Sequence, residues 1–391
     1  MNKALLNPEI QKFFRKNLKS DITTLVLKGS SFPGVSSAEI ATQISGLKTA
    51  KKKLPTWFKT VGILYPPKLN LEQTSSEITA KYKASLIQGD RLIDLTGGFG
   101  IDDYFFAESF KEVVYCELDE ELAEIAKHNF QQLRKGNIHV IPGDSLKTLE
   151  KSDSKFDMIY ADPARRDDYG GKVFKLTDCL PDIPANLDLL FKKSEKILIK
   201  TSPLLDITAG LGELKNVSEI HIVAVNNEVK ELLWFMDKAF TGSLQIKTIN
   251  FNKNQIEEFS GSIADKPEIN FSLPGKYIYE PNAAIMKSGL FEHLAEKTQT
   301  FKLHKNSHLF TSEELKEFPG RIFEMIDIKD FKPSMLKKEL KGIKANVTTR
   351  NFPENVSALR KLLKIKDGGE RYLFFTTTLE DKKIVLDCRK I

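Results

Sequence analysis

The amino-acid sequence predicts an α/β protein: a parallel, doubly wound sheet with a helical region before it and an α+β unit after it. From about residue 88, short apolar runs alternate with amphipathic helical patterns, as in parallel strands joined by helices. The C-terminal part orders its patterns as strand, helix, strand, helix, strand, strand, which suggests a ferredoxin-like sandwich. At roughly 100–200 residues per domain, the 391 residues suffice for two or three domains. We place these domains at 1–80, 81–240 and 241–391.

The region 1–80 is predicted to be helical, because signals for helix starts recur in it. Each signal stands just before an apolar pattern with helical spacing: Asn7 with Pro8, Ser36 with Glu39, and Thr74 with Glu77. The first pair offers an N-cap followed by a proline at the first helical position. The other two pairs have the spacing of a capping box. No strand pattern interrupts this part of the sequence.

Five strands and three helices are predicted next. The strands are 91–95, 113–116, 138–141, 156–161 and 197–200, and the helices are 101–110, 119–135 and about 185–195. The helix at 119–135 has the strongest signal, since acidic residues open it and Arg134-Lys135-Gly136 close it. After the fifth strand, two apolar runs flank Asn226-Asn227, which we interpret as an antiparallel hairpin. A helix that starts at one of these asparagines is the alternative.

The C-terminal unit is predicted from residue 321 onward. Its strands are 321–328, 345–349, 372–377 and 383–387, and its helices are 334–340 and 355–363. Apolar and polar residues alternate in the strands, as at Phe374 and Thr376, which indicates that one face of the sheet is wet. Between 241 and 320 the pattern is too weak to assign elements.

The composition excludes several classes of protein. With 41% hydrophobic residues the chain can form a core, so global disorder is excluded. No stretch approaches the roughly 18 apolar residues of a membrane span, and the N-terminus lacks the features of a secretory signal. The three cysteines are too few for a disulfide framework or a zinc site, and the six histidines lack metal-ligand spacing. We therefore expect a cytoplasmic protein that binds no metal.

The net charge of +6 is unevenly distributed. Residues 1–60 carry a net charge of +8 and residues 301–391 carry +7, whereas the region between them carries −9. Two basic flanks around an acidic centre could form a groove that attracts a polyanion. The alternative is that the lysines only solvate helix surfaces. Charge alone does not decide between these interpretations.

The chemical signal lies where four predicted strands end. The first strand runs into the glycine turn 94–100, at which the polar edge of a ligand can approach bare backbone. Glu117 and Asp144 end the next two strands, and Asp162-Pro163 ends the fourth. Open α/β sheets bind ligands at this edge. A carboxylate at Glu117 can accept both hydroxyls of a ribose, and one at Asp144 can accept an adenine amino group. The alternative is a generic doubly wound domain with surface acids.

These segments resemble the motifs of class I S-adenosylmethionine-dependent methyltransferases, over roughly residues 72–236. The resemblance implies a Rossmann-like core and S-adenosyl-L-methionine as the cofactor. It implies that Asp94 orients the methionine amino group or the loop itself, and that Glu117 binds the ribose. The other cofactor-binding residues that it implies lie beside the methionine moiety or the adenine: Thr96, Gly97, Gly98 and Gly100, and Asp144 and Ser145.

A closer resemblance covers nearly the whole chain. It is carried by Leu71–Ser75, Asp162–Arg165, Lys200–Pro203 and the C-terminal unit, and it is to a bacterial methyltransferase-like family with a THUMP-like, ferredoxin-type C-terminal domain. The catalytic half also resembles trimethylguanosine synthase, in its helical N-terminal extension and its segment 220–235. These resemblances imply a helical domain at 1–80, a class I methyltransferase domain at 81–240 and a THUMP-like domain at 241–391.

The proposed reaction site is Asp162-Pro163-Ala164-Arg165. Enzymes that methylate exocyclic amines of bases carry Asp/Asn-Pro-Pro followed by an aromatic residue, so this chain departs at its last two positions. The carboxylate and a backbone carbonyl accept the two amine protons, which aims the nitrogen lone pair at the methyl group, and transfer then needs mainly alignment. Arg165 or Tyr169 could stack on the base. Arg165 and Arg166 could equally bind phosphate or pair with Asp167 and Asp168.

Other candidates carry weaker signals. Lys200, at the end of the fifth strand, either faces the substrate or is a plain surface lysine. We interpret His128 as a helix-surface residue. Cys116 and Cys179 are interpreted as packing residues, which argues against carbon methylation by a cysteine nucleophile.

The sequence thus favours a methyltransferase that acts on a base nitrogen in RNA, gripped by the two flanking units. A methyltransferase of a protein or small molecule is the second hypothesis, and a non-catalytic nucleic-acid-binding protein is the third. The predicted roles are catalytic for Asp162, Pro163 and Arg165, and substrate-binding for Arg166, Tyr169 and Lys200. No membrane partner is expected, and the sequence does not specify an oligomeric state.

Overall fold

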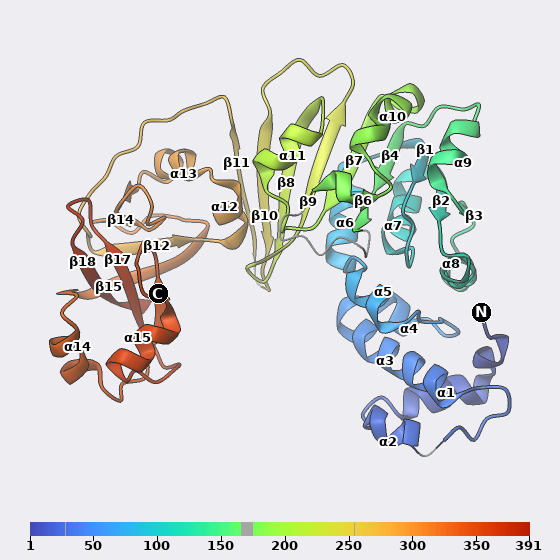
Figure 1. Ribbon diagram of the computed structural model, residues 1–391, viewed down its shortest axis with the longest axis horizontal. Coiled ribbons are helices and arrows are strands. Elements are labelled where there is room, and N and C mark those ends of the chain that lie inside the picture. Colours follow the sequence, from blue (N-terminus) through green and yellow to red (C-terminus); the bar gives the residue numbers. More distant parts are fainter. Residues whose placement is uncertain (28, 166–174, 254) are drawn as a thin grey trace. The chain divides into compact units, whose positions relative to one another are not determined.

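The computed structural model describes residues 1–27, 29–165, 175–253 and 255–391. The chain forms two compact units. The first comprises Met1–Ser218 and Leu233–Thr241, and the second comprises Glu219–Leu232 and Gly242–Ile391. Figure 1 shows their elements. Within the described ranges, no helix has both the length and the apolar character needed to cross a membrane.

Short helices precede the first strand, as predicted. They are η1 (Lys3–Leu6), α1 (Pro8–Lys16), α2 (Ile22–Leu27), α3 (Ser37–Lys53), α4 (Pro55–Lys59), α5 (Lys68–Gln73) and α6 (Glu77–Leu86). Asn7 caps α1, and Ser36 forms a capping box with Glu39 at the start of α3, which confirms two of the predicted starts. The start predicted at Thr74 is wrong. Ser76 caps α6 instead, because it stands directly before the first helical residue and reaches the third backbone N–H of the helix.

A sheet of nine strands has the order β11-β10-β8-β9-β7-β4-β1-β2-β3. Its strands are β1 (Gly89–Asp94), β2 (Phe110–Glu117), β3 (Ile138–Pro142), β4 (Met158–Ala161), β7 (Lys196–Thr201), β8 (Val217–Val225), β9 (Glu228–Asp237), β10 (Gln245–Phe251) and β11 (Ile256–Ser262). Strand β1 pairs in parallel with β2 and β4, and β3 and β7 continue the parallel pairing on either side. The five predicted strands of the doubly wound sheet are therefore confirmed.

Helices connect the parallel strands. They are α7 (Ile101–Ser109), α8 (Glu120–Gln132), α9 (Ser145–Lys151), η3 (Pro184–Asn186), α10 (Leu187–Lys193) and α11 (Ile207–Glu213). A two-stranded ribbon of β5 (Ala164–Arg165) and β6 (Cys179–Leu180) follows β4, with η2 (Leu176–Asp178) just before β6. The order along the sheet can be followed in Figure 1.

The hairpin predicted at Asn226-Asn227 is confirmed. These two residues join β8 to β9, which are neighbours in the sheet, and their φ angles are 51° and 62°. Asparagine tolerates this left-handed conformation, which a two-residue hairpin turn requires. The alternative of a helix at this point is wrong. Strands β10, parallel to β8, and β11, antiparallel to β10, were not predicted.

The second unit contains a sheet with the order β13-β14-β12-β15-β18-β17-β16. Its elements are β12 (Tyr277–Pro281), α12 (Ala283–Ser288), α13 (Phe291–Thr298), β13 (Phe301–Lys302), β14 (Phe310–Ser312), β15 (Gly320–Asp330), α14 (Pro333–Leu340), β16 (Asn346–Thr349), α15 (Val356–Leu363), β17 (Arg371–Thr377) and β18 (Lys383–Lys390). The four strands and two helices predicted after residue 320 are confirmed. Strands β12 to β14 extend the same sheet and were not predicted.

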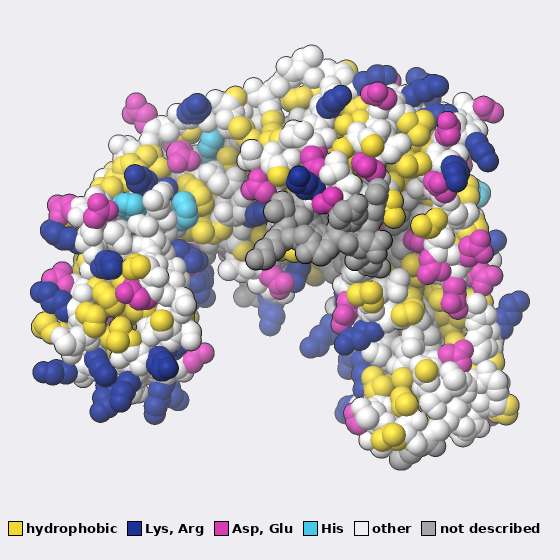
Figure 2. Space-filling view, viewed as in Figure 1, with side chains coloured by type: hydrophobic (Ala, Val, Ile, Leu, Met, Phe, Trp, Pro, Cys, Tyr) yellow, Lys and Arg dark blue, Asp and Glu magenta, His cyan; other side chains and the backbone are white. Residues whose placement is uncertain are grey.

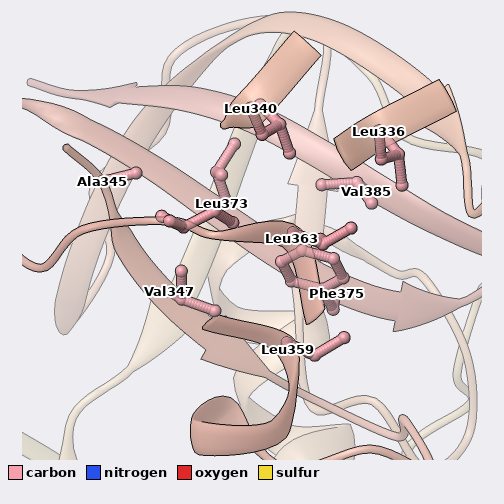
Figure 3. Close-up of a cluster of buried hydrophobic side chains, with 10 residues drawn as sticks. Leu336, Leu340, Ala345, Val347, Leu359, Leu363, Leu373, Phe375 and Val385 are labelled. Carbon is pink, nitrogen blue, oxygen red and sulfur yellow. The ribbon is translucent and has the colours of Figure 1, made fainter. Parts of the chain in front are cut away.

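An apolar core holds α14 and α15 against this sheet. Leu336 and Leu340 of α14 and Leu359 and Leu363 of α15 are at most 2% exposed, and Figure 3 shows them pointing towards Phe375 and its neighbours in the sheet. Burying one leucine contributes about 1.5–3 kcal/mol. Each helix is therefore fixed by its apolar side, which leaves its polar side in water.

Candidate active site

The candidate site lies where the order of the parallel strands reverses. The chain runs from β1 to β2 and β3 on one side of β1, then crosses to β4 on the other side. The loops after β1 and β4 therefore lie side by side at the carboxyl edge, which is where open α/β sheets bind ligands. A hydrogen bond joins these loops: Asp162 N donates to Thr96 Oγ1 at 2.7 Å.

Glycine is favoured at three positions of the loop after β1, for different structural reasons. A Cβ at Gly97 would lie 2.1 Å from the Tyr115 ring, and one at Gly100 would lie 2.4 Å from the Phe130 ring. These two glycines allow the loop to pack on the core cluster that contains both rings. A Cβ at Gly98 would meet only Thr96 O, at 3.7 Å, and the φ of Gly98 is 57°. Gly98 is thus the loop residue whose bare backbone faces open space.

Asp94 organises this loop from below. Its Oδ1 accepts hydrogen bonds from Thr96 N at 2.7 Å and from Thr96 Oγ1 at 3.0 Å. Burial raises the pKa of Asp94 to about 8, and the negative charges of Asp102 and Asp162 add to the rise. Thr96 Oγ1 donates to Asp94 and accepts from Asp162 N, so one hydroxyl connects the ends of β1 and β4.

Glu117, at the end of β2, is directed towards the glycine loop. Its Oε2 accepts a hydrogen bond from Gly98 N at 2.8 Å, and its Oε1 accepts one from Asp119 N at 2.9 Å. Both oxygens lie on backbone N–H groups, which fixes the carboxylate beside the one glycine that faces open space. The side chain remains half-buried rather than enclosed.

Asp144 and Ser145 follow β3 at the same edge. A 2.7 Å hydrogen bond from Gly143 N to Glu117 O joins the ends of β3 and β2. Asp144 Oδ1 caps α9 by accepting from Leu146 N and Lys147 N, and Asp144 Oδ2 lies 3.3 Å from Lys147 Nζ. Burial works to raise the pKa of Asp144, but the backbone and ammonium groups of Lys147 lower it overall. Ser145 is buried at the first position of the helix.

Asp162 carries the ion pair of the site. Its Oδ2 accepts a hydrogen bond from Lys200 Nζ, at the end of β7; the side chain of Asp162 is 33% exposed and that of Lys200 is 11% exposed. Pro163 is buried, and the backbone of Arg165 pairs with Cys179 in the β5–β6 ribbon. Arg166 and Tyr169, both predicted to bind substrate, lie outside the described residues.

Below the loop lies a buried network that the sequence did not reveal. Lys83 of α6 is 0% exposed, and its Nζ lies 3.2 Å from Asp102 Oδ1 and 3.0 Å from Ser75 Oγ. Asp102 Oδ2 accepts hydrogen bonds from Ser75 Oγ at 2.9 Å and Tyr160 Oη at 2.8 Å. Beside Asp102, Asp103 is also 0% exposed. The sequence contained no signal for this network, because Lys83 shares the buried side of α6 with Glu77, Thr79, Ala80 and Ala84.

The remaining candidates have structural partners. His128 Nε2 lies 2.8 Å from Gly62 O, as a histidine on the outside of α8. Cys116 and Cys179 are buried, as expected of packing residues. Among the residues that the structure describes, no group of three or more His, Cys, Asp or Glu side chains could hold a metal ion.

Family models match the second unit of the chain. A ferredoxin-like domain matches residues 277–319, and a THUMP domain-like model matches residues 320–390. No protein among the curated ones matches the chain.

A solved structure matches this chain over its full length. It is the crystal structure of a protein from Porphyromonas gingivalis W83, provisionally described as a methyltransferase, with 33% sequence identity and a TM-score of 0.88. The match covers 100% of this chain and 99% of that chain.

Two further structures match in part. A protein from Pyrococcus horikoshii, provisionally described as an RNA methyltransferase, is 22% identical with a TM-score of 0.28, covering 39% of this chain and 74% of that chain. The O-methyltransferase from Bacillus cereus in complex with SAH is 15% identical with a TM-score of 0.36, covering 50% and 98%. At TM-scores this low, neither match bears on the function.

Proposed function

The chain belongs to the family of the methyltransferase-like protein from Porphyromonas gingivalis W83, and from this premise we propose that it transfers a methyl group from S-adenosylmethionine to a base nitrogen in RNA. The family and the fold agree with the resemblance found in the sequence: an α/β methyltransferase core and a C-terminal domain of ferredoxin-like and THUMP-like type. The cofactor, the acceptor atom and the residue roles below are parts of the proposal.

The geometry around Gly98 carries the proposal. Gly98 offers backbone that a Cβ would cover, and the carboxylate of Glu117 is held beside it at 2.8 Å. A bare backbone edge next to a fixed carboxylate suits a nucleoside with a ribose diol and a charged amino-acid tail. Glu117 would accept from the ribose hydroxyls, and Asp144 with Ser145 would face the adenine. When bound, S-adenosylmethionine supplies a methyl group on a positively charged sulfur.

Asp162 is proposed to hold the acceptor. Its Oδ2 pairs with Lys200, whereas no hydrogen bond to Oδ1 is found among the described residues. A neutral amine on a base would donate one N–H to Oδ1, which turns the nitrogen lone pair away from the carboxylate. The ammonium of Lys200 offsets the charge of Asp162, so the pair accepts a neutral base more readily than a cation. Transfer then depends on alignment.

The RNA part of the proposal rests on the second unit. A THUMP domain-like model matches it, and residues 332–366 contain ten Lys and Arg against two Asp and Glu. Figure 2 shows Lys and Arg side chains gathered over α14 and α15. Exposed lysines that have no ion-pair partner among the described residues form this basic face: Lys337, Lys338, Lys341, Lys344, Lys361, Lys364 and Lys366. Phosphate groups are the partner that such a face binds, with strong dependence on salt.

The first experiment tests the reaction. Methyl incorporation from labelled S-adenosylmethionine into total RNA is measured with RNA from a strain that lacks this protein. We expect incorporation with the wild-type protein and none with Asp162→Ala, which removes the acceptor oxygen and should still bind S-adenosylhomocysteine in calorimetry. Equal incorporation with both proteins would contradict the role of Asp162. No binding of either cofactor form would favour a nucleic-acid-binding protein without turnover.

The second experiment tests the substrate class. The double variant Lys361→Glu/Lys364→Glu should weaken RNA binding at least tenfold and flatten its dependence on salt. Lys127→Glu, an exposed lysine of α8, is the matched control and should change neither. If the wild-type protein binds no RNA even at low salt, the substrate is a protein or a small molecule.

A further inference from the structure

Three buried carboxyl groups lie under the glycine loop, and they are not equally compensated. Asp102 has Lys83, Ser75 and Tyr160 as partners. Asp94 has the N–H and hydroxyl of Thr96. Among the described groups, neither oxygen of Asp103 accepts a hydrogen bond, although the residue is 0% exposed.

Asp103 faces another acid. Its carboxyl group lies against that of Asp94, and burial together with the charges of Asp94 and Asp102 places the pKa of Asp103 well above its ordinary value. Two carboxylates in contact in a buried site are ionised together only when a cation balances the second charge. If one of them is protonated, its O–H can donate to the other. Asp103 lies in the first turn of α7, but the stabilisation of a charge by a helix N-terminus is smaller than the cost of burying an unpaired charge.

The cations near the pair are already engaged. From α6, Lys83 faces Asp102. From β7, Lys200 pairs with Asp162, which follows β4. The groups contributed by β2 are Tyr115, Cys116 and Glu117, none of which is a cation, and β4 contributes Tyr160, whose hydroxyl donates to Asp102. Among the described residues, the elements around the pair supply no cation that is directed at it.

We propose that Asp94 and Asp103 together hold one proton in the free protein and release it when the cationic amino-acid end of the cofactor binds at the loop above them. This inference rests on the proposed function. The O–H bond of the protonated carboxyl breaks, the proton passes to the buffer, and the charge of the pair changes from −1 to −2. The bound ammonium group then balances the second charge.

Asp103 is a positioning residue in this scheme, because it acts on the cofactor only through Asp94. Asp94 in turn holds the backbone of Thr96, a residue of the glycine loop, by a hydrogen bond. The shared proton thus reduces the repulsion between Asp94 and Asp103 when no ligand is bound. Its loss makes both carboxylates negative when a cation binds. Neutral amides at positions 94 and 103 together would keep the shape of the site and remove the proton exchange, whereas an amide at 103 alone leaves a proton on the buried Asp94.

Calorimetry tests the proton release directly. S-Adenosylhomocysteine, which retains the amino-acid end, is titrated into the protein at pH 7 in phosphate and in Tris. A released proton is taken up by the buffer, and Tris gives out far more heat on protonation than phosphate does. We expect binding to be more exothermic in Tris, by up to one proton equivalent per site. Burial alone keeps a proton on Asp94 at pH 7 when position 103 is neutral. The double variant Asp94→Asn/Asp103→Asn should therefore be the one whose residual binding releases the same heat in both buffers. Asp153→Asn, an exposed control, should behave as the wild type.

The outcomes distinguish a failure of the proton release from a failure of the proposed cofactor binding. Binding with equal heat in the two buffers overturns the proton release and leaves the cofactor proposal intact. An absence of binding overturns both. Should Asp94→Asn/Asp103→Asn fold poorly or fail to bind, urea unfolding of the wild type gives a second test. A carboxyl whose pKa is raised by folding stabilises fully below pH 4 and loses this contribution as pH rises towards 8. Stability that does not fall over this range would contradict a shared proton.

Discussion

Replacing Gly98 with alanine distinguishes the glycine that is proposed to bind the cofactor from the glycines that pack on the core. The φ of Gly98 is 57°, so an L-residue there is strained by about 1–2 kcal/mol, part of which is returned because alanine restricts the unfolded chain. The new Cβ touches nothing closer than Thr96 O at 3.7 Å. We therefore expect Gly98→Ala to lower the free energy of unfolding by only about 1 kcal/mol.

The effect on binding should be larger than the effect on stability. The methyl group would occupy the open space over the backbone where the cofactor is proposed to pass. We expect the affinity for S-adenosylhomocysteine to fall at least tenfold, which is about 1.4 kcal/mol. Isothermal calorimetry measures the binding, and urea unfolding measures the stability.

Two matched variants bracket this result. Gly34→Ala has the same kind of strain, with φ at 73° and no atom within 4 Å of the new Cβ, and should lose stability without losing affinity. Gly97→Ala would place its Cβ 2.1 Å from the Tyr115 ring and should lose the most stability of the three. If Gly98→Ala binds S-adenosylhomocysteine as well as Gly34→Ala does, the cofactor does not lie over Gly98, and the reasoning fails.

Three further changes test other parts of the molecule. Glu117→Ala removes the acceptor beside Gly98 and should weaken cofactor binding by about 1–3 kcal/mol in calorimetry, and Glu117→Gln, which keeps one acceptor oxygen, should lose less. Lys83→Met leaves the buried carboxylate of Asp102 without its cation and should lower the free energy of unfolding, measured in urea, by about 3–5 kcal/mol. Adding Asp102→Asn to Lys83→Met removes the unpaired charge and should restore much of the lost stability. Burial lowers the pKa of His308 to about 4, so the contribution of the neutral imidazole to stability is full above pH 6.5 and is lost as pH falls towards 4. In His308→Phe, the new ring can stack on Phe291 and does not titrate, so the variant should lose less stability than the wild type between pH 6.5 and 4. An equal loss of stability in acid would contradict this.

The doubly wound sheet could be predicted because its signals are local. Each parallel strand is a short apolar run, and the capping pair Ser36 and Glu39 acts within four residues. Strands β10 and β11 could not be predicted for the opposite reason. Thr248 and Asn250 of β10 are polar yet buried, and β11 at the sheet edge alternates weakly and carries Glu257 and Glu258. Only their partners across the sheet make them strands.

The candidate site shows the same division. The acids at strand ends could be predicted to converge, because parallel strands end at one edge. The buried network around Asp102 could not be predicted, because Lys83 and Asp102 meet only through the packing of α6 on α7. The capping of α9 by Asp144 follows from its position directly before the helix, a local signal that the sequence contained. The pairing of Lys200 with Asp162 depends on β7 and β4 being neighbours, which the strand order alone determines.

Thr96 has a consequence for how the site can move. Because its single hydroxyl donates to Asp94 and accepts from the backbone of Asp162, the donor and acceptor loops are tied at one atom. Neither loop can shift by an ångström without breaking a hydrogen bond. Under the proposed function, the methyl donor and the acceptor would therefore bind to surfaces whose relative position is fixed beforehand, and any opening for their entry would have to come from other parts of the chain.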